Sequence, residues 1–206
     1  MTEYYDELET RDPEEREAAQ LAALPGQVAL AKLTPGNADA LAEIDPDLIT
    51  SREALAAVPV TRKGELIKRQ RPDAPFGGLN ATPVNEMKRF YLSPGPIAEP
   101  QGRRPDFWRV ARALFAAGFR AGDRVHNCFS YHFTPAGMMF DSGASALGCP
   151  VFPGGVGQTD QQVAAIVHFQ PTGYAGTPDF LKIILERADD LGADLSCIKK
   201  ALVGGG

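Results

Sequence analysis

The segment from Ser93 to Gly102 carries residue types from which a phosphate site could be built. It follows a short apolar stretch, residues 89–92, which we expect to be a strand, and it contains a hydroxyl at Ser93 and a glycine at Gly95. A strand that runs into a glycine-bearing loop lets backbone N–H groups approach an anion. The prolines at 94, 96 and 100 have no N–H to donate, and Glu99 would repel phosphate. We therefore expect a loop over residues 93–102, and a working nucleotide loop, an altered one and a simple turn all remain open for it.

A second group of candidate residues follows strands that we expect further along the chain. Ligands of open parallel sheets bind outside the carboxyl ends of the strands, so these residues predict a crevice for an acyl group or another substrate. They are Tyr131, His132, Phe133, Gly154 and Gly155, with Gly204, Gly205 and Gly206 after the last strand. Two alternatives stay open, because glycines also serve ordinary turns and His132 could be a half-buried structural histidine.

Other site chemistries find little support in the sequence. His126 lies inside an expected strand and His168 near a helix end, which favours structural roles for both. No Ser-His-Asp triad and no suggestive carboxylate pair can be assembled. No cysteine and histidine have the spacing of zinc ligands. The sequence therefore assigns no catalytic residue and no metal ligand.

Composition and charge restrict the class of partner. The 206 residues carry a net charge of −5 without a lysine or arginine run, which argues against nucleic acid. No stretch approaches the ~20 apolar residues of a membrane span, and the acidic N-terminus lacks a signal-peptide core. The three cysteines, Cys128, Cys149 and Cys197, are scattered, as is typical of reduced thiols. We expect a cytoplasmic protein with small-molecule ligands.

The first 74 residues are predicted to form a helical N-terminal cap. Asp12 and Pro13 supply a helix cap and a first-turn proline, and Pro25 should kink or divide the helix that follows. The expected helices cover residues 14–33, 37–44, 51–58 and 61–70. Proline-bearing turns join them.

Residues 75–206 are predicted to form an α/β subdomain. Within it, residues 105–203 alternate between helix and strand at short spacing, which is the pattern of a doubly wound, largely parallel sheet. The expected helices cover residues 105–118, 134–147, 159–169 and 177–191. The expected strands cover residues 124–130, 149–152, 172–175 and 200–203.

Several of these segments together resemble the N-terminal part of phenylacetate–CoA ligases and their relatives in the adenylate-forming, or AMP-dependent synthetase, superfamily. The resemblance extends in order from about residue 10 to the end of the chain. Its carriers are residues 55–61 with Lys63, residues 75–78, the segment 93–100, and the strand-end segments 127–133, 152–157 and 173–181.

The resemblance implies a reaction and its substrates. Enzymes of this family join a carboxylate to AMP from Mg²⁺–ATP, release pyrophosphate, and pass the acyl group to the thiol of CoA. It also implies that residues 93–100 occupy the phosphate-loop position, that Tyr131 to Phe133 contact an aryl acid, and that Gly204 to Gly206 lie on the adenine side.

The phosphate-loop position departs from the family pattern Ser-Ser-Gly-Thr-Thr-Gly-Lys-Pro. Ser93, Gly95 and Pro100 match it, whereas the intervening hydroxyls are absent and Glu99 replaces the lysine. This exchange reverses a charge, which at ~4–6 Å from a phosphate is unfavourable by roughly 1 kcal/mol or more. We expect weak triphosphate binding.

The final glycines resemble the start of the family's adenine-binding segment. The resemblance therefore implies an incomplete N-terminal domain, inactive by itself, with a missing C-terminal segment or a partner chain. A fragment and one half of a split protein both fit this expectation. An exposed sheet edge would also favour association, for example into a homodimer.

Two other functions remain open at this point. A non-catalytic binding or assembly subunit would keep the scaffold while its phosphate loop has degenerated. A doubly wound domain could also bind a flavin or another nucleotide, although no G-x-G-x-x-G motif opens a helix after a strand.

Overall fold

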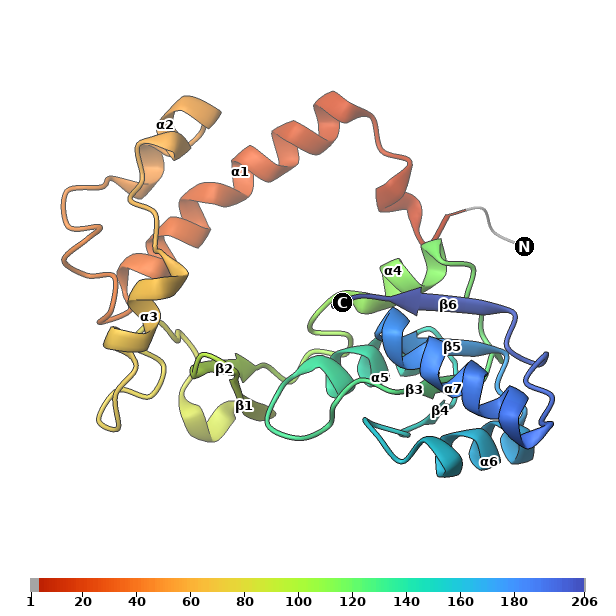
Figure 1. The fold of residues 1–206 in the computed structure, drawn as a ribbon. Coiled ribbons are helices and arrows are strands. Elements are labelled where there is room, and N and C mark those ends of the chain that lie inside the picture. The colour runs from red at the N-terminus through yellow and green to blue at the C-terminus, as the bar shows by residue number, and fades with distance from the viewer. Residues whose placement is uncertain (1–3, 206) are drawn as a thin grey trace. The chain divides into compact units, whose positions relative to one another are not determined.

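The computed structural model describes residues 4–205 of the chain. They divide into two compact units, residues 6–102 and residues 103–205 together with Tyr4 and Tyr5 (Figure 1). Each unit has its own packing and is described separately. Within residues 4–205, no helix is both long enough and apolar enough to cross a lipid bilayer.

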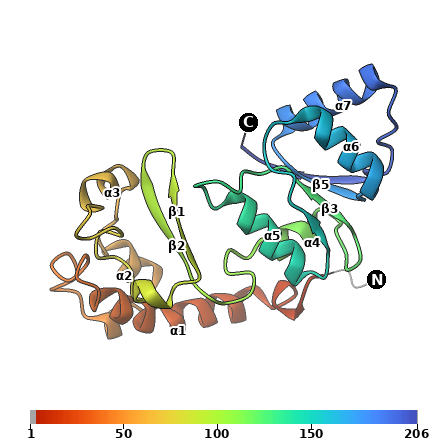
Figure 2. The same cartoon turned by 90° about the horizontal axis from the view of Figure 1, so that it is seen from below.

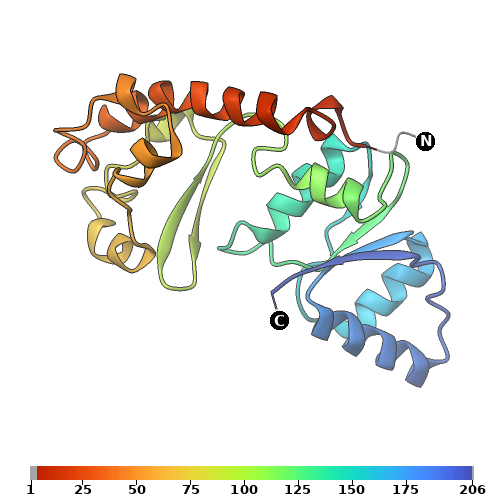
Figure 3. The same ribbon diagram turned by 90° about the horizontal axis from the view of Figure 1, so that it is seen from above.

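The unit formed by residues 6–102 contains the longest helix, α1 (Pro13–Lys32) (Figure 3). Its start is capped as the sequence predicts, because the Asp12 carboxylate accepts hydrogen bonds from the backbone N–H groups of Glu14 and Glu15. Pro13 then occupies the first turn, where no N–H is needed. The helix continues through Pro25, so the expected division there does not occur.

The remaining helices of this unit are short. They are η1 (Glu7–Glu9), η2 (Pro46–Leu48), α2 (Arg52–Ala56), α3 (Lys63–Arg69) and η3 (Val84–Glu86). Residues 37–44, which we expected to be a helix, form successive turns. Lys32 ties these turns to the end of α1, because its Nζ donates to the carbonyl oxygens of Ala42 and Ile44 at 2.9 and 2.8 Å.

An antiparallel hairpin completes this unit. Strands β1 (Arg89–Ser93) and β2 (Ile97–Gln101) pair across a turn at residues 94–96. The strand expected at 89–92 is confirmed, whereas the loop expected at 93–102 is wrong for residues 97–101, which form β2. A two-stranded ribbon leaves one edge of each strand without a ladder partner, and a residue that lacks an N–H is tolerated there. Pro100, opposite Phe90, is therefore compatible with a strand.

Along the chain, the boundary between the two compact units follows residue 102, whereas the sequence suggested a change at residue 74. The side chain of Gln70, which follows α3, links the helical residues to β2. Its Nε2 donates to the carbonyl oxygen of Ala98 at 2.9 Å, and its Oε1 accepts from the N–H of Ala98 at 2.8 Å. Phe76 also packs edge-on against Phe90, with ring centroids 6.4 Å apart. These contacts place the hairpin in the same unit as the helices.

The second unit contains the parallel sheet that the sequence predicts. Its strands are β3 (Val125–Asn127), β4 (Val151–Phe152), β5 (Gly173–Gly176) and β6 (Lys200–Val203), in the order β4-β3-β5-β6. All neighbouring pairs are parallel, and Val125 lies opposite both Val151 and Gly173. The carboxyl ends of all four strands therefore meet at one edge of the sheet.

Helices cover both faces of this sheet (Figure 2). They are α4 (Val110–Ala116), α5 (Ala136–Ala146), α6 (Thr159–Phe169) and α7 (Pro178–Leu191). Neighbouring residues of a strand point to opposite faces. Accordingly, Ala175 packs in a cluster with Leu114 of α4, whereas Tyr174 packs in a second cluster with Ile166 of α6. This arrangement confirms the prediction of an α/β, doubly wound fold.

Helix α4 begins five residues later than the predicted position 105, at Val110. Asp106 and Arg109 have φ angles of 44° and 59°, in the left-handed region that interrupts a helix. The Asp106 carboxylate accepts hydrogen bonds from the N–H groups of Val110 at 2.8 Å and Ala111 at 3.1 Å. Its side chain thus satisfies donors of the first turn and fixes the start of the helix.

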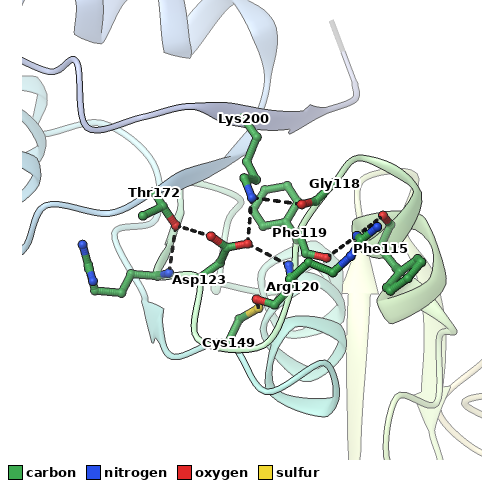
Figure 4. A network of polar contacts seen from close by, with 9 residues as sticks. Phe115, Gly118, Phe119, Arg120, Asp123, Cys149, Thr172 and Lys200 are labelled. Carbon is green, nitrogen blue, oxygen red and sulfur yellow. Dashed lines mark hydrogen bonds and ion pairs between the residues drawn. The ribbon is translucent and has the colours of Figure 1, made fainter. Parts of the chain in front are cut away.

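A polar network lies at the amino-terminal edge of the sheet, opposite the edge where the carboxyl ends of the strands meet (Figure 4). It joins the start of β6 to the segment that precedes β3. Lys200 at the start of β6 donates from Nζ to Asp123 Oδ2 at 2.8 Å and to the Gly118 carbonyl oxygen at 2.9 Å. The hydroxyl of Thr172 donates to Asp123 Oδ1 at 2.7 Å, and the N–H of Arg120 donates to Oδ2 at 2.7 Å. Burial alone would raise the pKa of Asp123, but these hydrogen bonds outweigh it and lower the pKa.

We predict that Asp123→Asn lowers the free energy of unfolding at pH 7 by about 1–3 kcal/mol, because it leaves the Lys200 ammonium without its carboxylate. A carboxyl with a lowered folded pKa stabilises the protein above its unfolded pKa of about 3.9 and loses this contribution as the pH falls through the folded value. The difference between wild type and variant should therefore shrink below about pH 4. Urea denaturation across this range measures it.

Asp189→Asn is the matched control, because Asp189 is an exposed residue of α7. It should change the stability by less than about 0.5 kcal/mol. Equal effects of the two substitutions at pH 7 would contradict the assigned role of Asp123.

Candidate functional site

A cavity lies at the carboxyl edge of the sheet. It has a volume of about 260 Å³ and is lined by Tyr131 and His132, which follow β3, and by residues 153–156 and Gln158, which follow β4. The structure thus brings Tyr131, His132, Gly154 and Gly155 together around one cavity. Their role in binding stays a prediction.

Asn127 at the end of β3 organises one side of this cavity. Its Nδ2 donates to the hydroxyl of Tyr131 at 2.8 Å and to the Gly137 carbonyl oxygen at 2.9 Å. Tyr131 in turn donates to Asp141 Oδ2 of α5 at 3.2 Å. Burial, together with the neighbouring Asp141 carboxylate, raises the pKa of Tyr131. The phenol therefore stays neutral, and the ring is held by its hydroxyl.

His132 and Phe133 occupy a tight turn beyond Tyr131. Ser130 Oγ accepts from the His132 N–H at 3.2 Å, and the His132 carbonyl oxygen accepts from the Thr134 N–H at 2.7 Å. Phe133 has a φ of 60° and is 79% exposed. It is absent from the residues that line the cavity, so the structure does not bring it together with the other predicted acyl-contact residues.

The other side of the cavity is the glycine-bearing segment after β4. The N–H of Gly155 donates to the Asn127 carbonyl oxygen at 3.0 Å, which fixes the segment to the end of β3. Beneath it, the buried side chain of Gln162 on α6 contacts both this segment and His126. Burial lowers the pKa of His126, and the hydrogen bond with Gln162 partly opposes this shift. His126 is therefore a neutral side chain beneath the cavity, consistent with the structural role that the sequence favours.

The lining residues determine what the cavity can do chemically. None of them is Asp, Glu, Lys or Arg, and none carries a thiol or an aliphatic hydroxyl. The cavity can thus hold an uncharged, partly apolar group against the ring of Tyr131, but it contains no nucleophile paired with a base. Across residues 4–205, no three His, Cys, Asp or Glu side chains form a group that could hold a metal ion.

The predicted phosphate-loop residues lie on the β1–β2 hairpin of the other unit. Ser93 ends β1, Gly95 is the middle residue of the turn, and Glu99 and Pro100 lie in β2. The Ser93 hydroxyl has one proton, and its acceptors are Glu99 Oε1 at 3.0 Å and the Ile97 carbonyl oxygen at 3.2 Å. Gly95 is the only residue of the turn 94–96 that has an N–H. These groups do not fit a triphosphate, because the hydroxyl is already bonded and the nearest charge is negative.

The predicted adenine-side glycines follow β6. The N–H of Gly204 donates to the Gly176 carbonyl oxygen at 3.2 Å, which continues the pairing of β5 with β6. Gly205 has a φ of 71°, and Gly206 lies outside the described residues. Gly204 and Gly205 are thus at the same edge of the sheet as the cavity, but they are not among its lining residues.

Sequence reasoning missed two polar residues of this site, Asn127 and Gln162. Both are almost fully buried, with 0% and 3% exposure. Asn127 ends a fully buried strand and precedes Cys128, whereas Gln162 follows a second glutamine, Gln161, and precedes the apolar Val163. A buried amide must have hydrogen-bond partners, so such a position marks a polar contact even where no motif does.

Comparison with known proteins adds a family to this geometry. No protein-family model matches the chain. It is 34% identical over 158 residues to a phenylacetate–coenzyme A ligase of Aromatoleum evansii, which covers 73% of this chain and 35% of that ligase. It is also 34% identical over 193 residues to the Thermus thermophilus ligase of the same name. This match covers 89% of this chain and 42% of that ligase.

Two solved structures resemble the chain over most of its length. Both are crystal structures of 2-hydroxyisobutyryl-CoA ligase at 25% sequence identity. The complex with 2-HIB-AMP in the postadenylation state has a TM-score of 0.85 and covers 94% of this chain and 43% of that one. The open conformation with 2-HIB-AMP and CoA has a TM-score of 0.86, and the match covers 94% of this chain and 45% of that one.

Over the length it covers, the chain belongs to the phenylacetate–CoA ligase family. It spans 35% and 42% of the length of these two curated phenylacetate–CoA ligases. The resemblance in the sequence is therefore confirmed as a relationship to part of these ligases. In this member of the phenylacetate–CoA ligase family, a cavity is present at the strand ends. The hairpin turn, residues 94–96, has one N–H and no lysine or hydroxyl that could hold a triphosphate.

We predict that His126 carries its proton on Nε2 and remains neutral when the pH is lowered through the ordinary histidine value of about 6.5. Long-range proton–nitrogen NMR of the variant His132→Gln/His168→Gln, which keeps one of the three histidines, reads both properties directly. Because the folded pKa is lowered, the unfolded chain takes up the proton first. Acidification below about pH 6.5 should thus reduce stability by up to about 1.4 kcal/mol per pH unit until the folded value is reached. An imidazole that titrates at or above pH 6.5 would contradict the assignment.

Proposed function

We propose that the protein containing this chain is an acyl-CoA ligase-like, adenylate-forming enzyme. In this reaction a carboxylate attacks the α-phosphorus of ATP to give an acyl-adenylate and pyrophosphate. The CoA thiol then attacks the acyl carbon, and AMP leaves. The proposal rests above all on sequence identity of 34% to phenylacetate–CoA ligases across as much as 89% of the chain.

We assign the cavity at the carboxyl edge of the sheet to the acyl part of the substrate. Its lining contains no Asp, Glu, Lys or Arg and includes the ring of Tyr131, which suits a small aryl acid better than a dicarboxylic acid. No group in this cavity can perform the adenylation step. We therefore assign this chain the task of binding and orienting the acyl group, and we expect it to be inactive without further residues.

The proposal extends to substrates and location. ATP with Mg²⁺ and CoA are the expected co-substrates of the complete enzyme, supplied with residues or a partner chain that lie outside this sequence. The hairpin of this chain does not fit the triphosphate. A cytoplasmic location is part of the same proposal. It is supported by three free thiols, two of which are buried within the fold.

A second function is favoured by one observation. The hydrogen bond between Ser93 and Glu99 occupies the serine that aligns with the family's phosphate loop and places a carboxylate where that loop has a lysine. This arrangement fits a non-catalytic binding or assembly subunit that keeps the acyl cavity and has lost triphosphate binding. The two functions differ in turnover, because only the enzyme releases pyrophosphate when ATP, CoA and an aryl acid are all present. Absence of such release by the longest natural polypeptide that carries this sequence, across a broad panel of acids, would leave the binding subunit.

We predict that the chain binds phenylacetate and that Tyr131→Ala weakens this binding about tenfold, because the substitution removes the aromatic wall of the cavity. Isothermal titration calorimetry measures both affinities. Phe133→Ala is the control: it removes an aromatic residue of the same turn that does not line the cavity, and it should leave the affinity within about twofold. Equal losses for the two variants, or no saturable binding by wild type, would refute the assignment of the cavity.

We predict that the double substitution Ala98→Gly/Glu99→Lys makes ATP binding appear or rise sharply, because it introduces a cation and removes one of the two acceptors of the Ser93 hydroxyl. Calorimetry with Mg²⁺–ATP provides the measurement. Glu43→Lys is the matched control, since it changes the net charge equally at an exposed position of the same unit. Micromolar ATP binding by the unmutated protein would show that the natural hairpin is not degenerate.

A further inference from the structure

Gln162 is a polar side chain in an apolar position. It lies on the face of α6 that packs Val163 and Ile166 into the core, and only 3% of it is exposed. Burying an amide without partners costs on the order of 1–3 kcal/mol. The buried side-chain amide of Gln162 therefore requires hydrogen-bond partners within the protein.

The partners of Gln162 are the glycine-bearing segment after β4, His126 of β3, and Cys128, whose Sγ lies 3.8 Å from Gln162 Oε1. Its Nε2 donates to the carbonyl oxygens of Gly154, Gly155 and Gly157 at 2.9, 3.2 and 3.1 Å. An amide has two N–H bonds, so the three carbonyl oxygens share them. Its Oε1 lies 2.7 Å from His126 Nε2. The opposite orientation of the amide would press its oxygen against three carbonyl oxygens, so the orientation and the Nε2–H form of His126 follow from chemistry.

The contact between Gln162 and the segment leaves no spare room. A Cβ atom added to Gly154 would lie 2.5 Å from Gln162 Oε1 and 3.1 Å from His126 Nε2. Gly154 is consequently the residue that lets the backbone approach the amide. Gly155 and Gly157, with φ angles of 66° and 73°, supply the left-handed conformations that the segment needs.

The hydrogen bonds also decide which way the peptide groups of the segment face. In a planar trans peptide the N–H points opposite to the preceding C=O. Because the carbonyl groups of Gly155 and Gly157 point to Gln162, the N–H groups of Val156 and Gln158 point away from it. Val156 and Gln158 line the cavity. Neither N–H has an acceptor within the part of the chain that the structure describes.

We propose that Gln162 is a positioning residue that holds residues 154–157 in the conformation that forms one wall of the acyl cavity. The inference rests on the proposed function for its ligand, a small aryl carboxylate. Gln162 itself does not line the cavity. It acts through the backbone of the glycine segment, with His126 fixing the orientation of its amide.

Hydrogen exchange tests the positioning role without any ligand. In Gln162→Leu, NMR should show that the N–H of Gly155 exchanges about tenfold faster, while the N–H groups of β5 change much less. Gln161→Leu is the matched control, because Gln161 is the exposed neighbour on the same helix. Gln162→Glu keeps the shape but cannot donate when ionised, and should behave like Gln162→Leu at pH 7.

Ile184→Val separates positioning from general destabilisation. Ile184 is fully buried in the hydrophobic cluster that contains Val163 and Tyr174, and this substitution costs about 0.5–1.5 kcal/mol. It should raise the exchange of β5 and of the glycine segment in similar proportion. If Gln162→Leu gives this same uniform pattern, or leaves the Gly155 N–H as protected as in wild type, the proposal is overturned.

Phenylacetate affinity provides the second measurement. Gln162→Leu and Gly154→Ala should each weaken phenylacetate binding about tenfold, whereas Gln161→Leu should not. Wild-type affinity in Gln162→Leu would overturn the positioning role. If wild type itself does not bind phenylacetate, the proposed acyl function fails, and the exchange experiment alone decides the role of Gln162.

Discussion

The hydrogen-bonded pairing of β3 with β4 on one side and β5 on the other is the constraint on which the rest of this unit depends. It places the ends of two strands, and the segments that follow them, at one edge of the sheet. The Asn127 carbonyl oxygen then anchors Gly155, and the Asn127 side chain anchors Tyr131. A single buried residue at the end of β3 thus holds both sides of the cavity. Without the parallel register, these groups would have no common neighbour.

Much of this fold could be predicted from the sequence where local signals and packing agree. Helix α6 and strand β6 have the predicted bounds. The start of α4 was missed, because positive φ at Asp106 and Arg109 is imposed by contacts and not by residue type. Strand β2 was missed, because its one proline, Pro100, lies on a ribbon edge that only the pairing with β1 reveals. Gln162 was missed, since the hydrogen bonds of a buried amide depend on which carbonyl groups the fold brings next to it.

Family membership and local chemistry carry different information in this chain. The sequence places it among phenylacetate–CoA ligases over part of their length. The hairpin departs from this pattern in its own contacts, because the Ser93 hydroxyl bonds to Glu99 across the ribbon. A chain can therefore be similar to a family over most of its length while the hydroxyl and the carboxylate of one hairpin bond to each other.

The hairpin turn also has a consequence for conformational entropy. Pro94 and Pro96 each fix one φ angle in the unfolded chain as well as in the folded one. Gly95 between them, with a φ of 150°, is left to absorb the reversal of direction. The turn therefore gives up less freedom on folding than a glycine-rich turn of the same length. It also has little freedom left to wrap around a bound molecule, so any ligand at this position must accept the shape that the turn already has.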